Sequence, residues 1–155
     1  MIYYLIASIL IAVTALFART KRAVLAAGIL FYAVQIAAAG LLLWGGLYDT
    51  TSAAFFTFDA LGTLFYLLLV VVSMYVFGHS EAYLQGEDLR SYRLYFALLM
   101  LLTTAIAGAY FANNLAVTWI FLEATTLCSA GIIYHRRTAQ ALEATWKYIF
   151  VCSVG

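Results

Sequence analysis

The chain has 155 residues, of which 66% are hydrophobic and only 10% are charged, and its formal net charge is +1. Soluble domains usually carry about a quarter charged residues. The composition therefore excludes a soluble globule with a polar surface, and the near-neutral charge gives no reason to expect nucleic-acid binding. We expect an all-α membrane protein in which residues 1–155 form a single transmembrane domain in the lipid bilayer.

Six hydrophobic segments follow one another along the chain. The first five are each close to the ~20 residues that a membrane-spanning helix needs, and they lack the alternating polarity of a barrel strand. The sixth would rise only ~22 Å as a helix, short of a ~30 Å hydrocarbon core. We therefore expect an incomplete sixth helix in the N-terminal part of a longer protein, with a truncated gene product as the alternative. The segments are residues 2–18, 23–44, 61–77, 94–111, 115–134 and 141–155.

Positive residues gather in alternate loops between these segments. The loops at residues 45–60 and 112–114 contain no lysine or arginine. Basic loops stay in the cytoplasm, so this pattern predicts that the N-terminus lies outside. The positive residues of the other three loops are Arg19, Lys21, Arg22, Arg90, Arg93, Arg136 and Arg137.

A glutamate, Glu123, lies inside the fifth segment, and a lysine, Lys147, lies inside the sixth. Such a residue at membrane depth is by default a functional hypothesis. The short link between the segments predicts antiparallel neighbours, which would bring the two side chains to within ~7 Å in depth. An isolated carboxylate in an apolar site takes up a proton, whereas a nearby lysine keeps it ionised. The pair is therefore predicted to load and release protons.

Structural alternatives stay open for each of these residues. Glu123 could instead form a hydrogen bond between helices. Lys147 could extend to the cytoplasmic interface or pair with Glu143 at the favourable i,i+4 spacing. Thr126 could help to hydrate Glu123, although membrane threonines more often bond to the backbone. His135 could pass protons from the cytoplasm toward Lys147, although a loop histidine beside arginines is more often a surface residue.

The remaining polar and aromatic residues predict structural roles. Asp59, just before the third segment, is expected to cap its helix. Cys128 and Cys152 lack a metal-binding spacing and are interpreted as small buried hydrophobic residues, so no metal or other cofactor is expected. Aromatic residues near the segment ends are typical of an interfacial belt; they are Tyr3, Tyr4, Trp44 and Tyr110.

The C-terminal part, residues 113–155, resembles the core of the antiporter-like membrane subunits. These subunits occur in respiratory complex I, in multi-subunit Na+/H+ antiporters and in membrane-bound hydrogenases, and the most similar type is component F of hydrogenase four. The resemblance is carried by Glu123 within LEATTL, the loop HRR, and Lys147 within ALEATWKY. Upstream, the stretch FFTFDALGTLFYLLLVVVSMYVFGHSEAY resembles the family's third helix.

The resemblance implies a proton-translocating subunit without a redox centre, in a complex such as formate hydrogenlyase or NADH:quinone oxidoreductase. Its partners would be other membrane subunits, and its location the inner membrane of a prokaryote. Glu123 matches the family's translocating glutamate, and Lys147 matches a lysine on the next helix. The later helices of the family are missing from this chain. A non-conducting structural subunit and an antiporter subunit that exchanges sodium for protons are the alternatives.

Overall fold

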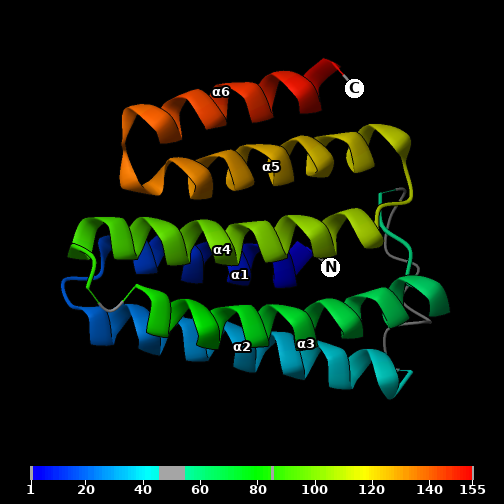
Figure 1. Ribbon diagram of the computed structural model, residues 1–155. Coiled ribbons are helices and arrows are strands. Elements are labelled where there is room, and N and C mark those ends of the chain that lie inside the picture. Colours follow the sequence, from blue (N-terminus) through cyan, green and yellow to red (C-terminus); the bar gives the residue numbers. More distant parts are fainter. Residues whose placement is uncertain (1, 46–54, 85, 155) are drawn as a thin grey trace.

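The computed structural model describes residues 2–45, 55–84 and 86–154 (Figure 1). Within these ranges the chain is helical, which confirms the all-α class. Most of the predicted loop at residues 45–60 lies outside the described residues. The helices are α1 (Ile2–Phe17), α2 (Lys21–Leu43), α3 (Ala60–Tyr83), α4 (Leu89–Tyr110), α5 (Leu115–Ile133), the short 3-10 helix η1 (Tyr134–Arg136) and α6 (Ala139–Val154).

Side-chain caps fix where several helices begin. Asp59 Oδ1 accepts a hydrogen bond from the backbone N–H of Gly62 at 3.1 Å, which confirms its predicted role at the start of α3. Asn114 caps α5 in the same way. Helix α4 begins at Leu89, five residues before the predicted apolar segment, because Asp88 provides an extended N-cap residue. Arg90 and Arg93 therefore lie on the first turns of α4 and not in a loop, which corrects the prediction.

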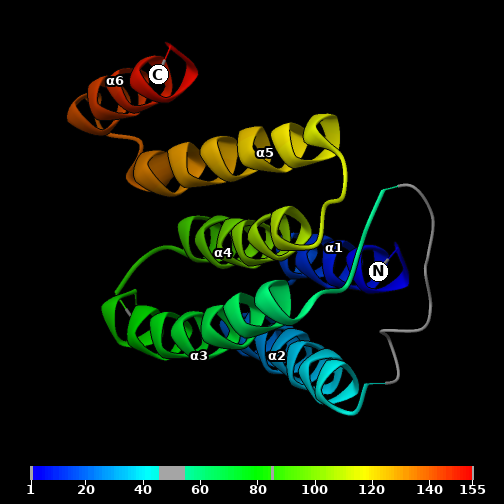
Figure 2. The same ribbon diagram turned by 90° about the vertical axis from the view of Figure 1, so that its right-hand side faces the viewer.

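Helix α4 lies at the centre of the bundle. It packs against α1, α2, α3 and α5, and one long face of it is buried (Figures 1 and 2). Helix α5 packs on α4, and α6 packs on α5 and η1 at the edge of the molecule (Figure 2). In α5 only Ala130 is buried, and α6 has no buried residue. The structure is thus a four-helix bundle with an added helical pair on one side.

Four helical stretches are long and apolar enough to cross a membrane: α2, α3, α4 and the continuous run Leu115–Arg136. Helix α1 is apolar but shorter, with 16 residues. Large apolar side chains such as Ile29 and Val71 are exposed on the outside of the bundle. A surface of this kind suits lipid and not water, so the chain is a helical membrane protein.

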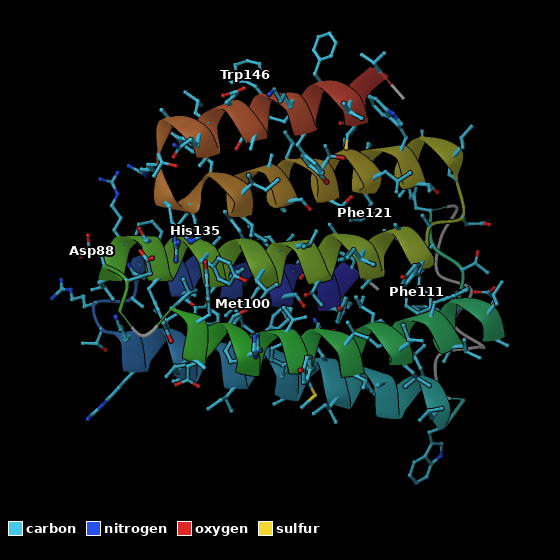
Figure 3. The ribbon with its side chains drawn as sticks, in the orientation of Figure 1. Asp88, Met100, Phe111, Phe121, His135 and Trp146 are labelled. Carbon is cyan, nitrogen blue, oxygen red and sulfur yellow. The ribbon has the colours of Figure 1, made fainter. Side chains whose placement is uncertain are left out.

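Gly108 allows α4 and α5 to approach closely. A Cβ atom at this position would lie 2.4 Å from Cε1 of Phe121 on α5 (Figure 3). Small residues permit such close packing in membrane bundles. We expect Gly108→Leu to destabilise the fold by about 1–3 kcal/mol through overpacking, seen as a lower unfolding temperature in detergent. Gly78→Leu on α3 is the matched control, because no atom lies within 4 Å of its Cβ position; an equal loss there would contradict this explanation.

Candidate membrane charge site

Glu123 lies near the middle of α5 and is partly exposed. It forms no hydrogen bond or ion pair with any residue that the structure describes. The structural alternative, a hydrogen bond between helices, is therefore not seen in this part of the chain. What the structure shows is a carboxyl group on an apolar helix whose only described neighbours are α4, α6 and η1.

Lys147 pairs with Glu143 on its own helix. The Nζ atom of Lys147 lies 2.6 Å from Oε1 of Glu143, one turn earlier on α6. The structure thus shows the i,i+4 alternative in place of the expected direct contact with Glu123. The reason is local, since side chains four residues apart share one helix face and the order Glu then Lys is the favourable one.

The Glu143–Lys147 pair lies on an open face of α6. Both side chains are exposed, and Lys147 lines a shallow hollow together with Trp146 and Phe150. Figure 3 shows Trp146 projecting from α6 away from the bundle. Cys152, near the end of the same helix, is also exposed, which corrects the expectation that it is buried, because α6 has only one neighbouring α-helix. Cys128 on α5 is partly buried.

Thr126 uses its hydroxyl group within α5. Its Oγ1 atom donates to the backbone carbonyl of Leu122 at 3.2 Å, and Thr125 donates to the same carbonyl at 2.7 Å. The structure therefore shows the backbone-bonded alternative for Thr126. Its oxygen lone pairs remain able to accept a hydrogen bond from water beside Glu123.

His135 is buried, with 8% of its surface exposed, which corrects the expectation of a surface residue. Its Nδ1 atom lies 2.8 Å from the carbonyl oxygen of Ile132, and its ring packs edge-on against Tyr95 of α4. The Nε2 atom has no partner. The chain turns through η1 and then Arg137, whose φ of 53° is left-handed, and this turn folds the imidazole ring against α4.

The three basic regions meet at one end of the bundle. Arg93 donates to the carbonyl oxygen of Ala18 at 3.0 Å, which joins α4 to the link between α1 and α2. Arg136 forms a 3.1 Å ion pair with Glu87 and lies over the ring of Tyr83, which joins η1 to the link between α3 and α4. Figure 3 shows His135 and Asp88 at this end and Phe111 at the other.

A buried polar cluster was missed by sequence reasoning. Gln35 of α2 is fully buried, and its Oε1 atom accepts hydrogen bonds from Tyr4 and Tyr66, both at 2.6 Å. Tyr4 was expected in an interfacial belt, but its hydroxyl points into the bundle, because an acceptor is available there. The signal in the sequence was Gln35 itself, the one amide side chain in the apolar run of residues 23–44.

Among the described residues, no group of three or more His, Cys, Asp or Glu side chains is arranged to hold a metal ion.

Comparison with known proteins gives a distant match. A 108-residue region is 29% identical to the protein named hydrogenase-4 component F homolog from Methylacidiphilum infernorum (isolate V4). The chain is a distant relative of that protein. The match covers 66% of this chain but only 23% of the relative. No protein-family model and no solved structure matches the chain. The resemblance to the component F type, predicted from the residues around Glu123 and Lys147, is confirmed.

Proposed function

We propose that this chain belongs to a proton-translocating membrane subunit of a redox-driven complex, of the membrane-bound hydrogenase or NADH:quinone oxidoreductase type. The observation that carries the proposal is Glu123, a carboxyl group in the middle of an apolar span without a polar partner among the described residues. A structural carboxylate at this depth is expected to have a partner, whereas one that takes up and releases protons must be free to change its charge. The relation to a hydrogenase-4 component F homolog supports the assignment.

Lys147, which forms the ion pair on α6, supplies the second charge of the proposed proton-translocating pair. Helices that pack directly lie 8–10 Å apart, so Lys147 and Glu123 can influence each other without touching. Protonation of Glu143 would release Lys147, and the freed cation would then favour the ionised form of Glu123. One proton arriving on α6 would thereby expel another from α5.

We propose His135 as the residue that supplies protons to this pair. It lies in η1, between Glu123 on α5 and Lys147 on α6, at the end of the bundle that carries the basic residues. Its unpartnered Nε2 atom can accept a proton from water, and its Nδ1 atom is already held by a carbonyl group. An imidazole nitrogen can both accept and donate a proton, which suits a relay between the aqueous phase and the Glu123 carboxyl group.

The proposed orientation places the basic end of the bundle in the cytoplasm and the N-terminus outside, with six membrane helices. Arg93 and Arg136 support this proposal, because they join the three basic regions at one end. We expect a single cysteine at Asp88 to be labelled only from the cytoplasmic side, and one at Asn113 only from outside. The background is a full-length subunit in which Cys128 and Cys152 are replaced by serine. Labelling of position 88 in intact cells would reverse the assignment.

A non-conducting membrane subunit is the second candidate function. It is favoured by the wide exposed apolar surface of α5 and α6, which suits docking to other helices. The two candidates differ in whether Glu123 must change its charge, and the glutamine variant considered in the Discussion separates them. Dependence of transport on sodium would favour the antiporter alternative over proton translocation.

A further inference from the structure

Four polar side chains from three helices meet in the half of the bundle away from the basic end. Tyr4 and Ser8 lie one turn apart on the same face of α1, Gln35 comes from α2 and Tyr66 from α3. Ser8 and Gln35 have no exposed surface, and Tyr66 is 1% exposed. None of these residues contributes to the site around Glu123, so the cluster needs a separate explanation.

The hydrogen bonds within this cluster do not satisfy its polar atoms. Tyr4 and Tyr66 both donate to Oε1 of Gln35, which uses both lone pairs of that oxygen. Among the described residues the Nε2 atom of Gln35, with two N–H groups, then has no acceptor, and Oγ of Ser8 makes no hydrogen bond of ordinary length, although it lies near the Tyr4 hydroxyl. Exchanging the oxygen and nitrogen atoms of the Gln35 amide does not satisfy the cluster either, because the amide oxygen then has no hydrogen-bond donor.

Leaving such groups unpaired is unfavourable. An unsatisfied buried polar group loses its hydrogen bonds to water without replacement, and the hydrocarbon around a membrane bundle offers no substitute partner. Buried water molecules remove this penalty, since they typically form two to four hydrogen bonds to groups of this kind. Water can accept from the Gln35 amide and donate to the Ser8 hydroxyl, which no apolar ligand can do.

A cavity lies beside the two tyrosines of the cluster, toward the end of the bundle. Its volume is about 230 Å³, and Tyr4 and Tyr66 line it together with Tyr3, Leu42, Phe58 and Phe111. These residues lie where α1 and α3 begin and where α2 and α4 end. One water molecule occupies ~30 Å³ in the liquid, so the cavity has room for several water molecules beside Tyr4 and Tyr66, the residues of the cluster that line it.

We propose that Tyr4, Ser8, Gln35 and Tyr66 form a binding site for internal water, which is filled through this cavity. Water bound at this site would lie among helices α1, α2 and α3. These helices are on the opposite side of α4 from α5 and α6 (Figure 2). It is independent of the proposed role of Glu123, because it rests on the unpaired atoms of Gln35 and Ser8 alone.

X-ray radiolysis of the assembled, full-length subunit tests this proposal, because bound water produces hydroxyl radicals that oxidise the nearest side chains. We expect Tyr66 to be oxidised several times faster than Tyr32. Tyr32 is the matched control, since it is also buried but its hydroxyl is satisfied by the carbonyl of Ser73 at 2.8 Å. Equal, low oxidation of the two tyrosines in the unmodified protein would overturn the proposal, whatever the variants do.

Two variants sharpen the test. Gln35→Leu removes the polar centre and should reduce the oxidation of Tyr66 to the level of Tyr32. Ser8→Ala removes only one partner of the water and should reduce it partly. If Gln35→Leu fails to assemble, Ser8→Ala and the comparison with Tyr32 still decide the question. Unchanged Tyr66 oxidation in both assembled variants would contradict the proposed site.

Discussion

Replacing Glu123 by glutamine in the assembled parent complex is expected to abolish proton translocation while leaving assembly intact. Glutamine keeps the shape of the side chain and its hydrogen-bonding ability but cannot exchange a proton. Loss of a proton-transfer group typically lowers a rate by about a hundredfold or more, so pumping should fall to the background leak. Assembly should persist, because an acidic residue at the helix centre disfavours insertion by ~2.5–3.5 kcal/mol and its removal relieves that penalty.

Two quantities are measured: proton uptake into vesicles that contain the complex, and redox turnover of the complex with an artificial electron acceptor. Turnover should survive, because this chain is not expected to carry a redox centre. Asp88→Asn is the matched control, since it removes the same charge at a helix start where the side chain makes no capping hydrogen bond. This control should pump normally. Glu123→Asp keeps the charge with a shorter reach, so it should retain part of the activity.

Normal pumping by the Glu123→Gln complex would show that the carboxyl group is a packing residue. The non-conducting candidate would then be favoured, because no other acidic side chain lies within the apolar part of α5. Loss of pumping in Asp88→Asn as well would point instead to a general effect of charge on assembly.

The membrane helices could be predicted from the sequence because a bilayer leaves few choices. Every backbone polar group must be satisfied internally, so a long apolar run becomes a helix. The ends were less predictable. Helix α4 begins at Leu89, since a polar first turn that carries Arg90 and Arg93 is stable at the membrane surface but is not hydrophobic. Asp59 was predicted correctly because capping depends only on neighbouring residues.

Contacts between helices could not be predicted in the same way. They depend on how each helix is rotated about its axis, and a helix that is apolar on all sides carries no signal for that rotation. The inward direction of Tyr4 follows from the rotation of α1, and the burial of His135 follows from the turn at η1. Gln35 was visible as a polar exception, but its partners on α1 and α3 were not.

We expect Lys147 to be required for proton translocation. The position of its charge should affect pumping more than its ion pair with Glu143 does. Lys147→Met removes the cation that we propose controls Glu123, so pumping should fall as far as in Glu123→Gln. The combination of the two substitutions should be no worse than either one, because residues that act in one path are not additive. Lys147→Arg keeps a cation and should retain partial activity.

An exchange of the two charged residues on α6 separates a functional lysine from a structural one. Glu143→Lys combined with Lys147→Glu keeps the net charge and an ion pair on the same exposed face. Such a pair contributes only about 0.2–0.5 kcal/mol on a helix, so folding and assembly should match the unmodified complex. The exchange moves the cation by one helical turn, or ~6 Å, and therefore changes its distance from Glu123. We expect pumping to be lost in vesicles although the complex assembles. Wild-type pumping by the exchanged variant would mean that Lys147 serves only to neutralise Glu143.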